Sequence, residues 1–361
     1  MLSPRPICMS CADIISGVPP SWLIPTSKDT RVRVDGFSKI IATDFPASGF
    51  GPSRPGTGRM RHFLDIRDHS ADTLQAMLDH AAEMKSALKA GRDGPKPLAG
   101  KSVAMIFEKP STRTRVSFEV GISQLGGTPL MMSAQDMQIG RGESIEDTAR
   151  VLSRYVDAIT IRCFSHDMLL TLAEHATVPV VNALTERSHP CQIMADLQTM
   201  IERHGPLDGQ IVTWIGDGNN VAASWIEAAA RFNFQLRIAC PEGYAPPAEL
   251  TAWSRAEGAD LVMYDSAIEA ATGSQTLVTD VWISMGDEEG TRREDFRPFQ
   301  LNEELLAVAA GDAVVMHCLP AWRGMEITEA VIDGPQSAVF DEAENRLHAQ
   351  KAVLSWCVSG N

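Results

Sequence analysis

Short apolar runs and amphipathic stretches alternate along the chain from residue 60 to its end. Apolar runs rich in β-branched residues predict strands, and apolar residues that recur every three or four positions predict helices. In the first half, the predicted strands are residues 102–107, 129–133, 157–162 and 178–182, and the predicted helices are residues 71–89, 114–125, 144–154, 166–175 and 190–204. This alternation is typical of a parallel sheet with helices on its faces.

The second half repeats the alternation. Its predicted strands are residues 210–215, 235–240, 260–264, 277–282 and 313–318, and its predicted helices are residues 220–232, 247–257 and 302–310. We therefore expect an α/β protein of two domains, each an open parallel sheet flanked by helices, over residues 60–200 and 201–342. A helix within residues 343–361, covering 343–356, is expected to pack back on the first domain.

Residues 1–59 differ from the rest of the chain. They hold eight of the 21 prolines, no glutamate, and seven Lys and Arg against four Asp. Proline and glycine at this density disfavour helix and strand, so we expect this segment to be disordered. A transit peptide, or sequence upstream of a natural start at Met60, are the alternative interpretations.

Composition narrows the class of protein. The 361 residues suffice for two ordinary domains, and the net charge of −14 disfavours nucleic acid or an anionic membrane as a partner. No run approaches the roughly 18 apolar residues that span a bilayer. Seven scattered cysteines suit a reducing compartment, so we expect a cytoplasmic protein. Cys8 and Cys11 have the spacing of zinc ligands, but no second ligand pair follows nearby, and we expect no metal.

A polar run, Ser-Thr-Arg-Thr-Arg, occupies residues 111–115 between the first predicted strand and a helix. In open parallel sheets, ligands bind beyond the carboxyl ends of the strands. Hydroxyl groups, two guanidinium groups and the free N–H groups of a helix start together favour phosphate. An ordinary helix N-cap with two surface arginines is the alternative interpretation.

Two further clusters follow predicted strands. His189 precedes Pro190, which favours the first helical turn, and Gln192 lies one turn on, so both side chains can face one cleft and bind a carbonyl or an amide. His189 as a simple capping residue stays open. Residues 216–220, Gly-Asp-Gly-Asn-Asn, lack the third glycine of a dinucleotide site and better suit a small polar ligand.

The last clusters lie after the strands of the second half. Asp280 ends an apolar strand and is followed by Ser284, Met285 and a glycine, which suits the capture of an amino acid, although a surface turn explains them equally well. Cys318 follows another apolar strand, where a buried structural cysteine is the commoner case.

Taken in this order, the motifs resemble the aspartate/ornithine carbamoyltransferase family over residues 60–361. The 111–115 run and the His-Pro-x-Gln motif at 189–192 are shared across that family and imply carbamoyl phosphate as donor. Residues 280–286 and the His-Cys-Leu-Pro motif at 317–320 resemble the ornithine branch. Gln138 points the same way, because the aspartate branch typically has a lysine there.

The resemblance also implies the site residues. Carbamoyl phosphate would be bound by Ser111, Thr112, Arg113, Thr114, Gln138 from a neighbouring subunit, Arg162, His189, Gln192, Cys318, Leu319 and Arg346, and ornithine by Asn220, Asp280, Ser284 and Met285. Cys318, Arg162, His189 and Asp280 would be catalytic, without metal or organic cofactor. A homotrimer, or a multiple of one, is implied as the assembly.

The implied reaction fits the chemistry of these side chains. Arg113 and the helix start would neutralise the phosphate, while Arg162, His189 and Thr114 would stabilise an oxyanion, where one donor is typically worth about 3–4 kcal/mol. The δ-amine of ornithine must lose a proton before it attacks. Cys318 and Asp280 are the candidate acceptors of that proton, and the departing phosphate is a third.

Other functions stay open from the sequence. An NAD(P)-dependent dehydrogenase would explain only the α/β pattern and the Gly-Asp-Gly motif. A catalytically silent binding subunit would be expected to lack a site residue, and none is missing. N-acetylornithine and putrescine are rival acceptors, and the same site can serve arginine synthesis or catabolism.

Overall fold

The computed structural model of the chain describes residues 60–109, 111–134, 137, 142–283, 290 and 292–359. The expected disorder of residues 1–59, including Cys8 and Cys11, lies outside these residues. So do Gln138, Ser284 and Met285.

A four-stranded parallel sheet forms the first half, as predicted. The strands follow the order β2-β1-β3-β4 and comprise β1 (Ser102–Phe107), β2 (Thr128–Ser133), β3 (Ala158–Arg162) and β4 (Val180–Leu184). The helices around this sheet, after a 3-10 turn η1 (Ile66–Asp68), are α1 (Ala71–Lys89), α2 (Thr112–Gln124), α3 (Ile145–Leu152), α4 (His166–His175) and α5 (Pro190–His204). The register of β1 against β3 pairs Phe107 with Arg162, so Arg162 stands at the carboxyl edge beside the start of α2.

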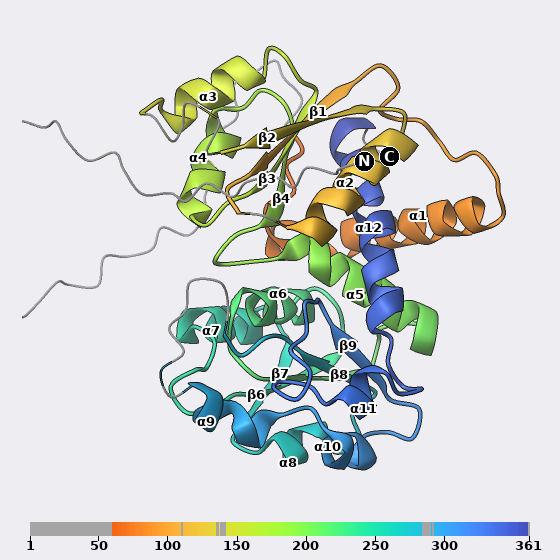
Figure 1. Cartoon of the computed structure of the whole chain (residues 1–361), viewed down its shortest axis with the longest axis vertical. Helices are drawn as coiled ribbons and strands as arrows, with labels where there is room; N and C mark the ends of the chain where they lie inside the picture. Colours follow the sequence, from red (N-terminus) through yellow and green to blue (C-terminus); the bar gives the residue numbers. More distant parts are fainter. Residues whose placement is uncertain are drawn as a thin grey trace, which may run out of the picture. The chain divides into compact units, whose positions relative to one another are not determined.

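A five-stranded parallel sheet forms the second half, in the order β7-β6-β5-β8-β9 (Figure 1). Its strands are β5 (Ile211–Ile215), β6 (Gln235–Ala239), β7 (Asp260–Tyr264), β8 (Thr276–Thr279) and β9 (Val314–His317). The register pairs Thr279 with His317, so the next residues, Asp280 and Cys318, leave the sheet side by side. The predicted strand 277–282 is therefore too long at its end, because its pairing stops at Thr279.

Helices around the second sheet include several that the sequence pattern did not predict. The predicted ones are α6 (Asn220–Ala229), α7 (Ala248–Ala256) and α10 (Glu303–Val308). The others are α8 (Ala267–Ala271), α9 (Arg292–Phe296), the 3-10 turn η3 (Arg297–Phe299) and α11 (Glu329–Ile332). Each is at most five residues long, too short to establish a helical period.

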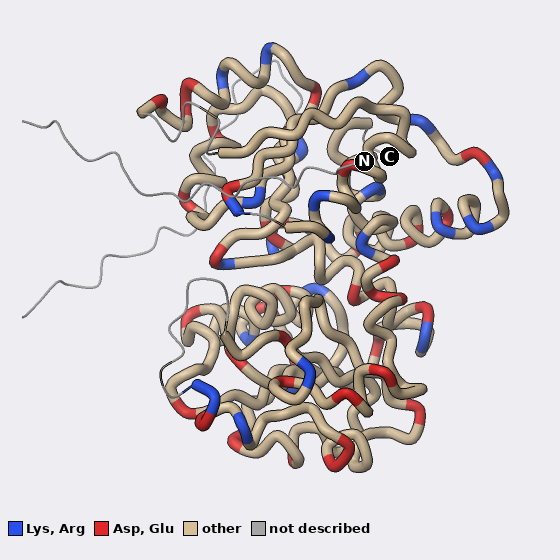
Figure 2. Tube along the Cα trace, in the orientation of Figure 1, with Lys and Arg blue, Asp and Glu red and all other residues tan. Residues whose placement is uncertain are grey.

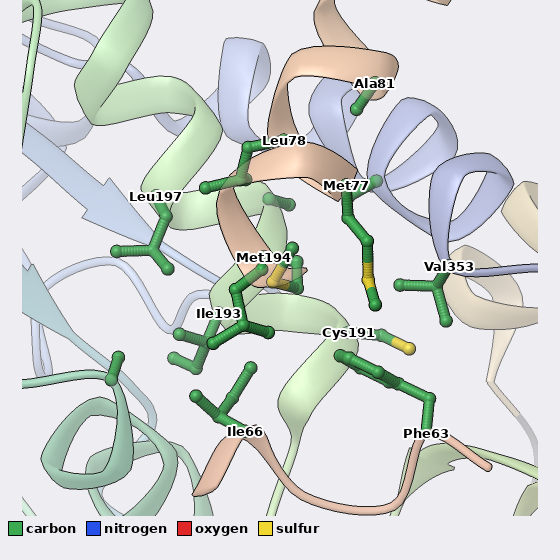
Figure 3. Packing of buried hydrophobic residues seen from close by; sticks show 14 of the residues in the cluster. Phe63, Ile66, Met77, Leu78, Ala81, Cys191, Ile193, Met194, Leu197 and Val353 are labelled. Carbon is green, nitrogen blue, oxygen red and sulfur yellow. The ribbon is translucent and has the colours of Figure 1, made fainter. Parts of the chain in front are cut away.

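The last helix, α12 (Val339–Ser359), packs against α5, α1 and α2 (Figure 1). It begins four residues before the predicted start, and its packing confirms that the end of the chain returns to the first domain. Side chains from α1, α5 and α12, among them Met77, Ile193 and Val353, meet in one apolar cluster (Figure 3). Each large side chain buried in such a cluster contributes about 1.5–3 kcal/mol.

The same cluster extends into the second domain, where it includes Trp214 of β5 and Trp225 of α6, both fully buried.

Acidic residues lie on the helices around the second sheet, α10 and α11 among them (Figure 2). Within the described ranges, none of the helices combines the length and apolar character that crossing a bilayer requires.

Candidate active site

One cavity of about 830 Å³ lies where the carboxyl ends of both sheets meet. Its wall gathers residues from Glu108 to Arg346, which are 238 positions apart in the chain. The predicted site residues that line it are Ser111, Thr112, Arg113, Thr114, Arg162, His189, Asn220, Asp280, Cys318, Leu319 and Arg346. The structure therefore brings together most of the predicted site, and both domains contribute to it.

The start of α2 forms the cationic part of the cavity. The Ser111 hydroxyl donates to Thr114 Oγ1 at 2.9 Å, and Arg162 Nη1 donates to both oxygens at 3.2 Å. Arg346 of α12 donates from Nη2 to Thr114 Oγ1 at 2.8 Å. Ser111 occupies the N-cap position, but its side chain makes no capping bond, so the hydroxyl faces the cluster instead. Arg115, by contrast, is the surface arginine of the alternative interpretation, with Glu119 3.7 Å away.

Positive charge is concentrated at this cluster without acidic partners. Within the described part of the chain, Arg113, Arg162 and Arg346 form no ion pair with a carboxylate, and the buried Nε atoms of Arg113 and Arg346 lack a hydrogen-bond partner. Burial, aided by Arg346 and Arg113, lowers the pKa of Arg162 to about 10, so it stays protonated at neutral pH. Three buried or half-buried guanidinium groups without counter-ions indicate an anion site.

His189 is the N-cap residue of α5 and is almost fully buried. Its backbone N–H donates to Ser224 Oγ at 2.8 Å, while its side chain makes no capping bond. Burial, followed by the charges of Arg346 and Arg162, holds the pKa of His189 well below its ordinary value. The imidazole is therefore neutral, and its Nδ1 has no partner among the described residues.

Gln192 lies one helical turn after His189 but is not part of the cavity wall. Its side chain is fully buried, and Nε2 donates to Asp196 Oδ1 and Glu342 Oε1, each at 2.7 Å. The expectation that His189 and Gln192 both line a cleft therefore holds for His189 only.

Asp280 and Cys318 form the acceptor side of the cavity. The Cys318 thiol donates to Asp280 Oδ1 at 3.2 Å, and Asn219 Nδ2 donates to Asp280 Oδ2 at 2.9 Å. Desolvation, followed by the Asp280 charge, raises the pKa of the Cys318 thiol well above its ordinary value. The thiol is therefore a protonated hydrogen-bond donor, and the carboxylate remains an acceptor facing the cavity.

The turn after Cys318 is fixed by a buried histidine. Leu319 has a left-handed backbone, with φ 57°, and its N–H donates to His317 Nδ1 at 2.9 Å. His317 Nε2 lies 3.1 Å from Glu326 Oε1, so both ring nitrogens are hydrogen-bonded. Asp280, His317 and Cys318 lie close enough to suggest a metal site, with ligand atoms within 4.8 Å of one another. Because His317 is bonded at both nitrogens, these side chains fit a hydrogen-bond network better than a ligand set.

The Gly-Asp-Gly motif has a packing explanation. A Cβ on Gly218 would lie 2.3 Å from the backbone nitrogen of Pro246, so only glycine fits where this turn meets the neighbouring loop. Asn219 caps α6 through Oδ1, and Asn220 Nδ2 donates to the Thr185 carbonyl at 2.7 Å. The motif therefore ties the second domain to the loop that carries His189, and its glycine spacing does not require a dinucleotide.

Several cavity residues were not predicted. They include Phe164, Leu184, Thr185, Glu186, Asp217 and Trp322. Asp217 belongs to the Gly-Asp-Gly-Asn-Asn run at residues 216–220, but it was not itself predicted as a site residue. Trp322, 61% exposed, follows the predicted Leu-Pro motif by two residues. The others extend the ends of β3 and β4, where the only signal was their position after a strand.

Two family models match the chain. One, described as the carbamoyl-P binding domain of aspartate/ornithine carbamoyltransferase, matches residues 61–202, and the other, described as the Asp/Orn binding domain, matches residues 208–357. A protein named ornithine carbamoyltransferase from Nitrobacter winogradskyi is 56% identical over 299 residues, covering 82% of this chain and 97% of that protein.

Solved structures also resemble the chain over most of its length. The ornithine carbamoyltransferase from Pyrococcus furiosus has a TM-score of 0.80 at 46% identity, covering 83% of this chain and 98% of that chain. The anabolic ornithine carbamoyltransferase from Campylobacter jejuni has a TM-score of 0.79 at 37% identity, covering 84% of this chain and 100% of that chain.

Proposed function

The chain belongs to the aspartate/ornithine carbamoyltransferase family, and from this premise we propose that it transfers the carbamoyl group of carbamoyl phosphate to the δ-amine of L-ornithine. The products are L-citrulline and phosphate. One observation carries the proposal beyond the similarity: a single cavity holds three arginines that form no ion pair among the described residues, together with an Asp280–Cys318 pair. The first group suits a phosphate dianion, and the second suits an ammonium or amine.

In this proposal the arginines bind the donor. The phosphate of carbamoyl phosphate lies at the start of α2, where Arg113 and the first-turn N–H groups neutralise it. Arg162 and Arg346, which both donate hydrogen bonds to Thr114 Oγ1, also donate N–H groups to the ligand oxygens. Because three positively charged arginines lie together at the start of α2, the phosphate of the ligand supplies the negative charge that balances them.

In the same proposal, the carbonyl oxygen of carbamoyl phosphate accepts hydrogen bonds from one cationic and two neutral side chains. Arg162 is charged, whereas the low pKa of His189 keeps that imidazole neutral. Together with the Thr114 hydroxyl they stabilise the oxyanion that forms when the amine attacks. A neutral His189 contributes a directed hydrogen bond without adding to the repulsion among the arginines.

The acceptor reacts as a free amine. Asp280 attracts the δ-ammonium group of ornithine, and the Cys318 thiol holds the carboxylate in place. The ammonium group first releases one proton to Asp280. The amine nitrogen then forms a bond to the carbonyl carbon, the bond from that carbon to the phosphate oxygen breaks, and the second proton passes to the leaving phosphate. Since Cys318 is itself protonated, it acts as a donor and not as the base.

Citrulline formation with four acceptors tests this function directly. The purified chain is assayed with carbamoyl phosphate and ornithine, N-acetylornithine, putrescine or aspartate. We expect kcat/KM to be highest for ornithine, because the relatives described above are named ornithine carbamoyltransferases. A higher kcat/KM for any other acceptor, or no carbamoylation at all, would overturn the proposal.

The domains divide the substrates in this proposal: residues 60–200 bind carbamoyl phosphate, residues 201–342 bind ornithine, and the C-terminal helix returns Arg346 to the first. Arginine biosynthesis is the proposed role, supported by the resemblance to a relative described as anabolic. Five free cysteines among the described residues support a reducing cytoplasm as the compartment.

A homotrimer is the proposed assembly. Val116 and Val120 lie one turn apart on α2 and are 51% and 39% exposed, and α2 packs against the edge strand β2. On β2, Leu130 and Met131 are 41% and 39% exposed. Adjacent exposed apolar residues at a sheet edge indicate an interaction surface. Light scattering should give about three times the 39.2 kDa chain mass, and a monomer would contradict the proposal.

A further inference from the structure

The turn of residues 185–188, between β4 and α5, leads directly to His189. The Thr185 N–H donates to the carbonyl of Ser188 at 2.9 Å, and Thr185 Oγ1 accepts the N–H groups of the last two residues of the turn, each at 3.3 Å. The Thr185 carbonyl accepts Asn220 Nδ2 at 2.7 Å. This turn therefore sets the positions of two residues of the cavity wall, His189 and Asn220.

Two buried side chains of the first domain contact the turn at both of its ends. His166 is the first residue of α4 and is 4% exposed, and its Nδ1 lies 3.0 Å from Thr185 Oγ1. On the other side of the ring, Nε2 lies 3.4 Å from Asp65 Oδ2. Asp65 is 2% exposed, and its Oδ1 accepts the hydroxyl of Ser188, which in turn accepts Asn182 Nδ2 at 3.0 Å.

The hydrogen bonds of Thr185 determine the tautomer of His166. A hydroxyl oxygen accepts two hydrogen bonds and donates one. Backbone N–H groups occupy both acceptor positions of Thr185 Oγ1, so its hydrogen is donated to His166 Nδ1. The imidazole proton is then on Nε2, which faces Asp65. Burial would raise the pKa of Asp65, but the contacts with His166 and Ser188 hold it below its ordinary value, so this carboxylate is an acceptor that favours the same tautomer.

We propose that His166 and Asp65 are positioning residues for carbamoyl transfer, which act by holding the turn of residues 185–188. Asp65 fixes the tautomer of His166, and His166 fixes the hydroxyl of Thr185. Neither His166 nor Asp65 is part of the cavity wall, so neither contacts a substrate. This inference rests on the proposed function and adds to it two residues that act on the cavity through its neighbouring turn.

The phosphate part of the cavity provides an internal reference. In the part of the chain that the structure describes, the hydroxyl groups at the start of α2 bond to Arg162 and Arg346 and not to this turn. Inorganic phosphate, used as a competitive inhibitor against carbamoyl phosphate, therefore reports on the arginines alone. By contrast, kcat/KM for ornithine also depends on His189 and Asn220. A positioning role requires that these two constants respond differently.

Three substitutions of His166 separate the two contacts of its ring. An Asn side chain places an oxygen where Nδ1 lies and can accept the Thr185 hydroxyl, whereas Gln reaches the place of Nε2 and Asp65, and Phe makes neither contact. We expect His166→Phe and His166→Gln to lower kcat/KM for ornithine by about 10–100-fold, the cost of a buried group that loses its partner. His166→Asn should stay within about threefold of the wild type, and Ki for inorganic phosphate within about twofold in all three variants.

Asp65→Asn tests the tautomer. The oxygen of the substituted amide can still accept the Ser188 hydroxyl, so its NH2 faces His166 Nε2 and drives the imidazole proton to Nδ1. That N–H then opposes the hydroxyl of Thr185. We expect kcat/KM for ornithine to fall about tenfold. In the His166→Asn background, Asp65→Asn should cause no further fall, because no imidazole is left to change its tautomer.

His175→Asn is the matched control. His175 is the last residue of α4, and its Nδ1 contacts the Thr171 carbonyl of the same helix at 3.1 Å. This variant should leave kcat/KM and Ki unchanged. Hydrogen exchange of the Ser188 amide measures the turn without any substrate. Exchange should be faster in His166→Phe than in the wild type, and unchanged in His166→Asn and in His175→Asn.

Each outcome decides the proposal. Faster exchange and a lower kcat/KM in His166→Phe, both restored by His166→Asn at constant Ki, support it. A normal kcat/KM in His166→Phe, an equal weakening of all constants, or an effect of Asp65→Asn that persists in the His166→Asn background overturns it. Failure of the proposed function is distinct, because citrulline formation would be absent in the wild type, and the exchange rates would still show whether His166 holds the turn.

Discussion

The loss of kcat/KM in a Cys318→Ala variant distinguishes two roles for this cysteine, a hydrogen-bond donor to Asp280 and a general base. The variant removes a thiol that donates to Asp280 Oδ1 at 3.2 Å, while Asn219 keeps its bond to the other carboxylate oxygen at 2.9 Å. A hydrogen bond to a charged group is worth about 1.5–3 kcal/mol, and a thiol is a weak donor, so the lower end applies. We expect kcat/KM for ornithine to fall about tenfold.

Loss of a general base would be far more severe, typically about 10²–10⁴-fold in rate. The raised pKa of the Cys318 thiol argues against that role, because a group that holds its proton accepts none. KM for carbamoyl phosphate should stay unchanged, since the family resemblance implies that this substrate contacts the backbone of Cys318 and Leu319, which the substitution leaves in place. Cys318→Ser, which keeps a donor, should recover most of the lost activity.

The assay is citrulline formation with varied ornithine between pH 6 and 10, for the wild type and both variants. The pH profiles of kcat/KM should have the same shape, because the ornithine amine and not the cysteine titrates. Cys240→Ala, at a buried free cysteine outside the cavity, controls for simple loss of packing. A drop beyond about 100-fold that serine fails to restore, with loss of the alkaline limb, would refute the reasoning.

Three further predictions follow from the geometry. Arg113→Ala should lower carbamoyl phosphate binding and turnover by several orders of magnitude while circular dichroism shows an intact fold; near wild-type kinetics would remove Arg113 from the phosphate site. Gly218→Ala should destabilise the chain by about 1–3 kcal/mol in urea unfolding, because its Cβ would overlap Pro246, 2.3 Å away. The folded state raises the pKa of Asp196 from 3.8 to about 7, mainly through burial, so the stability from this bound proton is complete below about pH 4 and is lost as pH rises through 7. Asp196→Asn should therefore flatten the fall in melting temperature between pH 5 and 8; an unchanged slope would assign that fall to other groups.

The apolar pattern of the sequence was sufficient to predict long helices and strands that pair along their whole length. The bounds predicted for the first strand coincide with β1, Ser102–Phe107. The strand predicted to end at residue 282 stops at Thr279, because its neighbour β9 ends at His317 and offers no further partner. A strand end of this kind depends on a segment some 40 residues away, which local pattern does not encode. The exposed Phe340 similarly breaks the apolar period at the start of α12 and conceals its true beginning.

Site residues could be predicted where polar side chains come directly after a predicted strand. They could not be predicted where the side chains that meet belong to elements far apart in the sequence. The spacing of Gln192 and Asp196 on one helix already indicates a contact. Nothing in the sequence pairs them with Glu342. Likewise, Asn219 was identified as a candidate ligand, whereas its oxygen caps α6 and its nitrogen holds Asp280. Which partner each donor and acceptor atom has depends on the tertiary structure.

The C-terminal helix explains how a strongly cationic cavity is compatible with a stable fold. Arg346 adds a third buried positive charge beside Arg113 and Arg162, and burial together with the Arg113 charge lowers its pKa. That cost is acceptable because α12 is anchored elsewhere, by apolar packing on α5 and α1 and by the buried Lys85–Asn345 contact of 2.7 Å. The helix can therefore hold Arg346 in the cavity despite the repulsion from the other two arginines. Electrostatic repulsion among the arginines persists in the free protein and is relieved by an anion, which is the condition under which binding energy is available to the donor substrate.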